Sequence, residues 1–382
     1  MKNVFLFAIC ILLNFHSYSQ TIYKEFKSEK LGESRRLKIQ LPRNYDANTE
    51  KKYPIVLVLD ADYLFEPVAG NVDYFSYWED MPESIVVGVM QSDSRYDDCA
   101  YDDNTFMPAD KGAQFFEFIG LELIPHIDKT YRTAKFIIGV GHDFTANFLN
   151  YYLFKDPPLL NGYINLSPDM APLMGSRLVE RIPKISGKIF YYLATGTDDI
   201  TGLRESSEDL NKQLSGLKSK SFNYYYDNFD GATHYSLGGR GIPNALEKIF
   251  SVYRPISKKE FNDVLLKMDT PISQYLIDKY TTIEELFGIK NNIRVNDFIA
   301  TATAAEKQNQ WESLREIATL AKKQYPKTVL GDYYLGRYYE ETGEPKKAMK
   351  IFQGGFNKSE VDFITVDKLL ERADKIKDDF GY

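Results

Sequence analysis

The chain has 382 residues, a formal net charge of −7, 43% hydrophobic residues and 26% charged residues. This length allows one large domain plus a smaller one, and the composition is that of a globular protein rather than of a disordered chain. An acidic balance without a basic block argues against a nucleic-acid partner. We interpret the 28 tyrosines and 25 phenylalanines mainly as core residues.

Residues 1–19 have the pattern of a secretory signal peptide. Lys2 precedes an apolar run over residues 4–15, and small residues lead up to Ser19 in the spacing of a cleavage site. The run is too short to be a membrane span. We therefore expect export to the periplasm or the medium after cleavage near Ser19/Gln20. Cys99 is then the one cysteine of the mature chain, which excludes an internal disulfide.

Residues 20–257 alternate apolar runs with amphipathic stretches, which predicts an α/β fold with a doubly wound, mostly parallel sheet. Alternating apolar positions over residues 21–41 indicate two antiparallel strands joined at Gly32. Continuous apolar runs predict further strands within residues 53–59, 84–90, 135–140, 162–167, 188–196 and 221–229. Helical spacing is found over residues 66–81 and 114–129.

Residues 258–382 are expected to form a small all-α domain. The segment GDYYLGRYYEETGEPKKAMKIFQGGF, residues 331–356, has the two-helix pattern of a tetratricopeptide repeat, with small residues such as Gly336 and Ala348 where the helices would approach. A weaker copy precedes it by 34 residues, so we predict TPR-like repeats over about residues 295–360. Such an array either docks a protein partner or packs against the larger domain.

The stretch FIIGVGHDFTANFLNYYL, residues 136–153, reads as a buried strand, a tight turn and the start of a helix. In α/β-hydrolases this arrangement is the nucleophile elbow, G-x-S-x-G, which presents a serine at its third position. Here the elbow reads Gly141-His142-Asp143-Phe144-Thr145. An aspartate therefore stands where the nucleophilic serine is expected.

Four further stretches carry a family resemblance: LPRNYDANTEKKYPIVLVLDADYLF, ELIPHIDKTYRTAKFIIGVGHDF, NGYINLSPDM and DGATHYSL. Over most of residues 21–250 the chain resembles the esterase branch of the α/β-hydrolases, which contains enterochelin esterases, esterase D and feruloyl-type esterases. The resemblance implies an α/β-hydrolase fold, an ester-containing small molecule such as a siderophore or carbohydrate ester as substrate, and no cofactor.

The resemblance also assigns site residues. The nucleophile position falls on Asp143 and the catalytic histidine on His234. The acid that would partner the histidine is Asp198 or Asp199, with Glu205 a more distant candidate. The oxyanion hole would use the backbone N–H of Phe144 and a second one from Ala61, Asp62 or Tyr63. The pocket would also be lined by His142, Arg95 and Tyr101.

Asp143 changes the chemistry that these positions can perform. A carboxylate attacks acyl carbon poorly, and beside His234 it would form an ion pair that reduces the availability of the histidine as a base. Thr145 is a second departure, because the last elbow position is usually small. We interpret the two changes as relaxed constraint and predict a catalytically degenerate protein that binds a ligand or a protein.

Two alternatives remain open. The chain could be an active hydrolase of ester-containing small molecules. Asp143 could also be a nucleophile, as in haloalkane dehalogenases and epoxide hydrolases, whose elbow reads G-x-D-x-G. Those enzymes need a cap domain, and the sequence has no cap-sized insertion after the elbow.

The sequence does not predict a metal site. Asp97, Asp98, Asp102 and Asp103 share one loop, but their spacing fits no EF-hand, and we interpret them as a pocket rim. Three histidines and one cysteine follow residue 19, so a zinc site would need carboxylate ligands that no motif supports. Walker and dinucleotide glycine motifs are also missing from the sequence.

Overall fold

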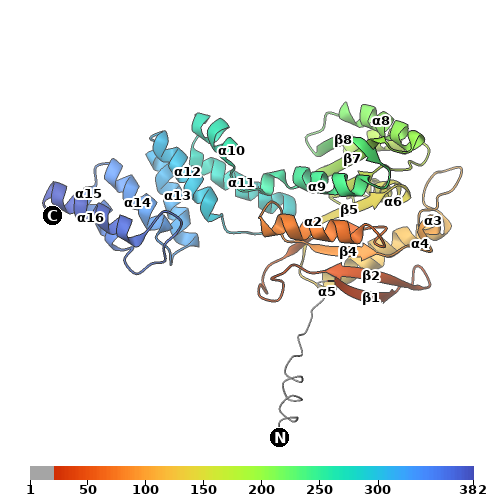
Figure 1. Ribbon diagram of the computed structural model, residues 1–382, viewed down its shortest axis with the longest axis horizontal. Coiled ribbons are helices and arrows are strands. Elements are labelled where there is room, and N and C mark those ends of the chain that lie inside the picture. Colours follow the sequence, from red (N-terminus) through yellow and green to blue (C-terminus); the bar gives the residue numbers. More distant parts are fainter. Residues whose placement is uncertain (1–20) are drawn as a thin grey trace, which may run out of the picture.

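The computed structural model describes residues 21–382 (Figure 1). The predicted signal peptide and its cleavage site lie outside the described residues. Within the described part of the chain, no helix is long and apolar enough to cross a membrane.

An eight-stranded sheet forms the centre of the larger domain, with the strand order β1-β2-β4-β3-β5-β6-β7-β8. The strands are β1 (Thr21–Lys27), β2 (Ser34–Gln40), β3 (Tyr53–Val58), β4 (Ile85–Val89), β5 (Thr133–His142), β6 (Gly162–Leu166), β7 (Ile189–Asp198) and β8 (Phe222–Thr233). Strand β2 is antiparallel to both of its neighbours, and the remaining pairs are parallel. This is the predicted mostly parallel sheet of an α/β-hydrolase fold.

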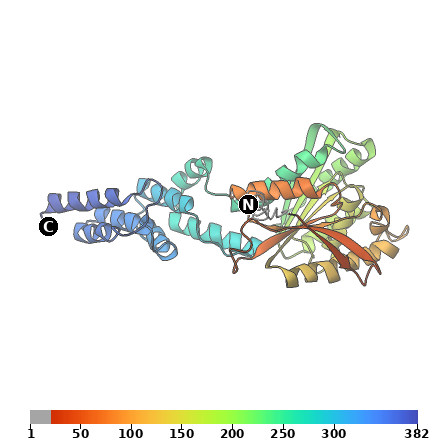
Figure 2. The same ribbon diagram turned by 60° about the horizontal axis from the view of Figure 1, so that its bottom comes forward.

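Helices cover both faces of this sheet (Figure 2). One face is covered by α2 (Phe65–Tyr77) and α9 (Leu237–Ile249). The other is covered by α4 (Asp110–Glu117), the π-helix η1 (Phe118–Leu123), α5 (Ile124–Thr130), α6 (Phe144–Leu149), α7 (Met174–Arg181) and α8 (Thr201–Ser215). Because side chains alternate along a strand, Ile55 and Leu57 enter one core whereas Val56 and Val58 enter the other. A strand buried on both faces must be apolar throughout, as the sequence of β3 is.

Residues 258–382 form an all-α domain that extends away from the sheet (Figure 1). Its helices are α10 (Lys258–Asp263), α11 (Ile272–Phe287), α12 (Val295–Lys307), α13 (Trp311–Gln324), α14 (Leu330–Glu341), α15 (Pro345–Gln353) and α16 (Val366–Phe380). From α11 onward each helix packs against the next. A Cβ atom on Gly336 of α14 would lie 2.3 Å from the ring of Phe352 on α15, so the glycine allows this close approach. The helical pairs agree with the expected helix positions, and their classification as TPR-like repeats stays a prediction.

Helix α11 belongs to two cores. Ile272 and Leu276 in its first half lie in the core of the helical domain. Ile283 and Phe287 in its second half lie in the core that covers the sheet, where Phe287 contacts Phe136 of β5 at a ring-centroid distance of 5.0 Å. The sequence places the domain boundary between residues 257 and 258. The second half of α11 lies after that boundary but still contributes to the core of the larger domain.

Two glycine substitutions test the packing of the helical domain. We expect Gly336→Ala to lower the free energy of unfolding by about 1–3 kcal/mol, because the new Cβ overlaps the Phe352 ring. The matched control is Gly70→Ala within α2, where no atom lies within 4 Å of the new Cβ. An alanine there should be neutral or stabilise by roughly 0.5–1 kcal/mol. Urea unfolding followed by circular dichroism measures both, and equal effects of the two variants would contradict the described packing.

Candidate functional site

The carboxyl ends of the parallel strands meet at one edge of the sheet, and a polar residue follows nearly every one of them. These residues are Asp60 after β3, Asp143 after β5, Ser167 after β6, Asp199 after β7 and His234 after β8. Arg95 joins them from the short helix α3 (Arg95–Asp98), which follows β4. The topology thus brings the predicted elbow, histidine and acid to one place.

The elbow has the strained backbone of a nucleophile elbow. Asp143 has φ 59° and ψ −121°, which non-glycine residues rarely adopt. A Cβ on Gly141 would lie 2.7 Å from the backbone of Thr145, so glycine is required where strand and helix approach. The sharp turn therefore persists with aspartate in the place of serine.

The guanidinium of Arg95 binds both the elbow and Asp60. Its Nε lies 2.6 Å from Oδ1 of Asp60 and its Nη2 lies 3.1 Å from Oδ2 of the same carboxylate. The Nη2 group also donates to the carbonyl of His142 at 3.0 Å, and Nη1 lies 3.2 Å from Oδ2 of Asp143. One guanidinium thus joins two carboxylates and the backbone of the elbow.

This arrangement corrects the expected ion pair between Asp143 and His234. Within residues 21–382 the cation paired with Asp143 is Arg95. Burial raises the pKa of Asp143 above its ordinary value, although Arg95, His234 and a hydrogen bond from the Phe144 backbone act in the opposite direction. The N–H of Phe144 is the group predicted as the first oxyanion donor.

Thr145 is not a sign of relaxed packing, which corrects a second expectation. Its side chain is fully buried. Its Oγ1 donates to Oδ2 of Asp60 at 2.7 Å and accepts from the N–H of His142 at 2.9 Å. The hydroxyl ties the elbow to the same aspartate that orients Arg95.

His234 is paired with Asp199 rather than with either alternative acid. Its Nδ1 lies 2.9 Å from Oδ1 of Asp199, and Thr195 donates to the other oxygen of that carboxylate at 2.8 Å. Burial opposes the charge on Asp199, but these hydrogen bonds prevail and lower its pKa to about 2. Asp198 and Glu205 are both exposed, so their assignment as the acid is wrong.

His142 lies against His234, with ring centroids 4.2 Å apart. Its Nε2 lies 3.2 Å from the carbonyl oxygen of His234, which can only accept, so Nε2 carries the proton. Its Nδ1 then lies 3.0 Å from the Tyr63 hydroxyl, whose single proton is shared between this nitrogen and Oδ2 of Asp60, also at 3.0 Å. Burial is the main cause that lowers the pKa of His142 to about 4, with the charges of His234 and Arg95 acting in the same direction. The ring is therefore neutral at pH 7.

Two of the three N–H groups predicted as the second oxyanion donor are already hydrogen-bonded within the backbone. The N–H of Ala61 donates to the carbonyl of Val89 at 3.1 Å, and that of Tyr63 donates to the carbonyl of Asp60 at 3.1 Å. The carboxylate of Asp62 accepts from the N–H of Gln91 at 2.7 Å, whereas the backbone N–H of Asp62 has no hydrogen-bond partner among residues 21–382. Ala61 and Tyr63 could act as predicted only after losing a backbone hydrogen bond.

The aspartate-rich loop has a structural role. Asp98 is buried and pairs with Arg35 at 2.6 Å, while Asp102 accepts from two backbone N–H groups of its own turn. Tyr101 pairs with Pro108 across this loop, and Asp169 raises the pKa of its hydroxyl in addition to burial. Among residues 21–382 no group of three or more His, Cys, Asp or Glu side chains is arranged to hold a metal ion.

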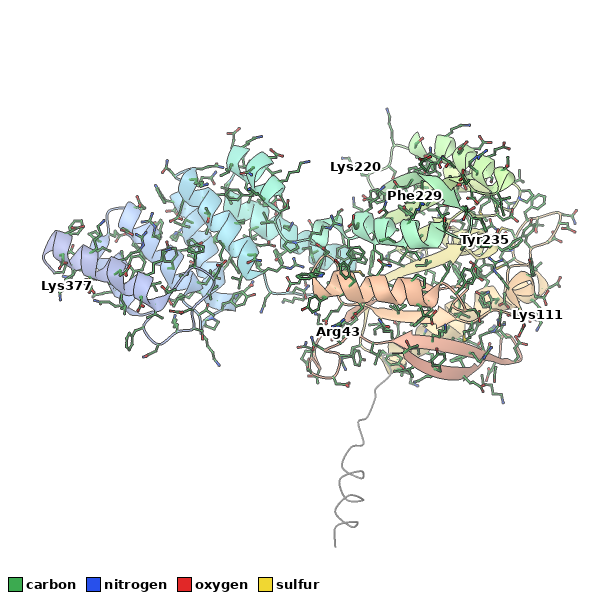
Figure 3. All side chains as sticks on the ribbon, in the orientation of Figure 1. Arg43, Lys111, Lys220, Phe229, Tyr235 and Lys377 are labelled. Atoms are coloured by element: carbon green, nitrogen blue, oxygen red, sulfur yellow. The ribbon has the colours of Figure 1, made fainter. Side chains whose placement is uncertain are left out.

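Two residues of the site were not predicted from the sequence. Asp60 connects Arg95, Thr145 and Tyr63, and Ser167 places its Oγ 3.2 Å from Nδ1 of His234. Asp60 and Ser167 each follow a buried parallel strand, as Asp143 and Asp199 do. Their position at a strand end was therefore the signal that could have identified them. The exposed ring of Tyr235 lies beside His234, just before the N-terminus of α9 (Figure 3).

Comparisons with known proteins give a family and several solved structures. A family model described as "Putative esterase" matches residues 28–141. An uncharacterised protein from Capnocytophaga ochracea is 30% identical, with a TM-score of 0.86, over 94% of this chain and 100% of its own. None of the curated proteins matches the chain.

Two more distant structures share the fold. An IroE-like serine hydrolase from Shewanella oneidensis is 22% identical, with a TM-score of 0.57, over 79% of this chain and 99% of its own. The siderophore hydrolase EstA from Aspergillus nidulans is 13% identical, with a TM-score of 0.52, over 63% of this chain and 97% of its own.

Replacing Arg95 should destabilise the fold. In Arg95→Met the carboxylate of Asp60, whose side chain is 2% exposed, loses its counter-charge. We expect the free energy of unfolding at neutral pH to fall by about 3 kcal/mol. The control is Lys184→Met, which breaks an exposed ion pair with Glu180 and should leave stability nearly unchanged. Urea unfolding compares them, and similar losses in both variants would contradict a structural role for Arg95.

His142 should make stability depend on pH. Its folded pKa of about 4 is below the unfolded value of 6.5, so the unfolded chain binds more protons between these values. The stabilisation that neutral His142 provides is complete above pH 6.5 and is lost as the pH falls toward 4. The loss is about 3 kcal/mol by proton linkage. The natural chain should therefore lose its stability advantage over His142→Gln as the pH falls from 6.5 toward 4. Urea unfolding at several pH values measures this difference. A constant difference would contradict the assignment.

Proposed function

We propose that this chain is an exported member of the esterase family of the α/β-hydrolases and that it binds an ester-like ligand without cleaving it. The match of the "Putative esterase" model to residues 28–141 and the shared fold of the IroE-like serine hydrolase support the family. The pairing of Asp143 with Arg95 is the observation that carries this proposal. Acyl transfer by this fold needs a hydroxyl that the histidine can deprotonate and a free oxyanion hole. The elbow supplies no such hydroxyl, because Asp143 stands in its place and its carboxylate pairs with Arg95.

The ligand class is inferred from chemistry and family. EstA is named a siderophore hydrolase, and its likeness to this chain concerns the fold. Siderophore esters are therefore the first ligands to test. The Arg95 guanidinium and the aromatic rings of Tyr96 and Phe144, whose centroids are 5.2 Å apart, would meet a ligand with polar and aromatic groups.

An active hydrolase is the second candidate, because the pair of His234 and Asp199 is complete. Nε2 of His234 has no hydrogen-bond partner among residues 21–382. With Nδ1 bonded to Asp199, this atom could take a proton from water. Asp143 as a nucleophile toward saturated carbon is less well supported, because Arg95 already binds one of its oxygens.

Ester hydrolysis by the natural chain and by three variants, Asp143→Ser, Asp143→Asn and His234→Ala, separates these candidates. All four proteins are incubated as mature chains with short-chain p-nitrophenyl esters. We expect the natural chain to hydrolyse them at the same rate as the His234→Ala variant. Asp143→Ser should be faster by roughly a hundredfold, because it restores a hydroxyl that the histidine can deprotonate.

The double variant Asp143→Ser/His234→Ala is the matched control and should lose the gained activity. Turnover by the natural chain that disappears in Asp143→Asn would contradict the proposal and favour a carboxylate nucleophile. Turnover that survives in Asp143→Asn but not in His234→Ala would favour water activation by the histidine.

The helical domain is proposed as a docking surface for a protein partner. Its support is the exposure of Phe356, Phe363 and Phe380 on a domain that extends away from the sheet. Removing residues after Lys258 is an unsuitable test, because α11 completes the core of the larger domain. The Gly336→Ala variant is a better choice: partner capture should fall while ligand binding at the elbow persists.

A further inference from the structure

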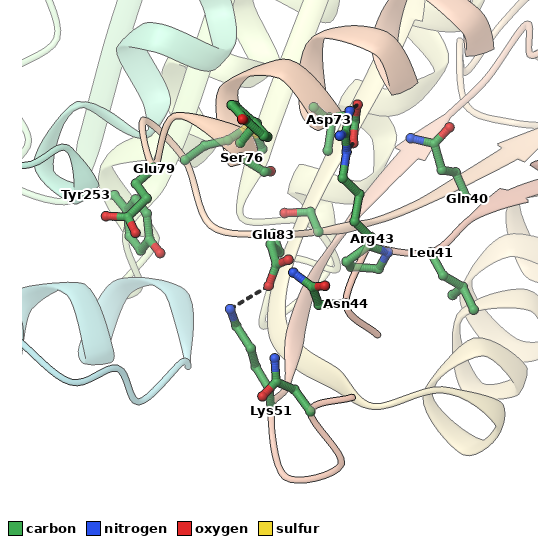
Figure 4. Close-up of a pocket in the computed structure, with 16 residues that line it drawn as sticks. Gln40, Leu41, Arg43, Asn44, Lys51, Asp73, Ser76, Glu79, Glu83 and Tyr253 are labelled. Carbon is green, nitrogen blue, oxygen red and sulfur yellow. Dashed lines mark hydrogen bonds and ion pairs between the residues drawn. The ribbon is translucent and has the colours of Figure 1, made fainter. Parts of the chain in front are cut away.

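A second polar groove lies at the opposite edge of the sheet from the elbow. It follows the end of β2 and precedes β3, and two adjoining cavities of about 430 and 400 Å³ form it. Both are lined by Lys51, Glu79 and Tyr253, so they make one continuous groove between the sheet domain and the helical domain (Figure 4). We call it the interdomain groove. Figure 3 shows Arg43 of this groove and Tyr235 of the elbow region at opposite ends of α2.

The charges that line the groove are mutually neutralised. Nε of Arg43 lies 2.7 Å from Oδ1 of Asp73. The corresponding pairs of Lys51 with Glu83 and of Arg294 with Glu79 are separated by 2.6 Å and 2.7 Å. Three cations and three anions therefore leave no net charge, which disfavours an anionic or cationic ligand. Each pair nevertheless presents a donor and an acceptor side by side, which is the arrangement that two neighbouring hydroxyl groups can satisfy.

Side-chain amides supply further hydrogen-bonding capacity. Asn44, Asn48, Asn292 and Asn296 line the groove. Their amide groups have no hydrogen-bond partner within the part of the chain that the structure describes. An amide both donates and accepts, and it carries no charge. The lining thus favours a neutral ligand that is rich in hydroxyl groups.

Aromatic rings stand next to these polar groups. Tyr74, Tyr77 and Trp78 at the end of α2 are 61%, 62% and 60% exposed, and we call them the aromatic platform. Tyr77 itself lines the groove, and the guanidinium of Arg43 lies 5.4 Å above its ring. The face of an aromatic ring carries partial negative charge, so it attracts the C–H groups on the flat side of a sugar ring. Three large exposed rings within five residues mark a binding surface.

We propose that the interdomain groove and the aromatic platform bind a neutral oligosaccharide. Hydroxyl groups bond to the paired charges and the asparagine amides, while the apolar face of a sugar ring packs on Tyr77 or Trp78. The site is separate from the elbow and does not depend on the function proposed for it. A location between two domains is one where ligand sites commonly occur.

Titration calorimetry on the full mature chain tests this inference. The probes are cellohexaose, xylohexaose, maltohexaose and chitohexaose, followed by an array of neutral glycans. We expect at least one neutral glycan to bind with a Kd below about 1 mM. Tyr77→Ala and Trp78→Ala should each weaken binding by about tenfold or more. In a Trp311→Phe background, the remaining Trp78 fluorescence should change on binding.

Two controls separate this site from others. Tyr23→Ala removes an equally exposed tyrosine, 65% exposed on β1, and should leave binding unchanged. Asp143→Asn should also bind the glycan normally, and equal weakening by it would place the sugar at the elbow and overturn the inference. Circular dichroism establishes that each variant is folded.

Other outcomes would also overturn it. These are no binding to any neutral glycan, binding restricted to sulfated or carboxylated glycans, and binding that Tyr77→Ala and Trp78→Ala leave unchanged. Self-association of the natural chain that Trp78→Ser abolishes, measured by light scattering, would assign the aromatic platform to contacts between copies instead.

Discussion

The guanidinium of Arg95 is the group on which the rest of the elbow depends. Asp60 and Asp143 lie at the same edge of the sheet and would repel each other without a cation between them. A guanidinium has five N–H donors in one plane, so it can bond two carboxylates and the carbonyl of His142 together. A lysine ammonium could not reach all three in this geometry. Aspartate at the elbow is thus accommodated by an arginine that Asp60 holds in place.

The site consists of two hydrogen-bonded groups that meet at the histidine pair. One joins Arg95, Asp60, Thr145 and Tyr63, and the other joins His234, Asp199 and Thr195. Neutral His142 touches both, through the Tyr63 hydroxyl and through the ring and carbonyl of His234. A protonated His142 would be repelled by the positive charge of Arg95, so the neutral ring is the form that fits this position. The pair of His234 and Asp199 is thus complete, whereas the carboxylate of Asp143 is held by Arg95.

Much of this architecture could be predicted from the sequence, because buried parallel strands are nearly uniformly apolar and their ends carry the polar residues. The elbow, His234 and Asp199 followed from that pattern and from the family resemblance. The partner of Asp143 did not, since Arg95 is 48 residues away and its direction is set by Asp60. Thr145 was misjudged because a β-branched residue suggests steric conflict, whereas its hydroxyl has two partners. Hydrogen bonds between residues that are far apart in the sequence produce no periodic pattern, so they could not be predicted from it.

Helix α11 couples the stabilities of the two domains. Its first half is buried in the helical core and its second half in the core beside β5, and Arg294 pairs with Glu79 just beyond it. Unfolding of either core would therefore expose apolar side chains of the same helix to water. Each domain thus contributes to the stability of the other through one shared helix.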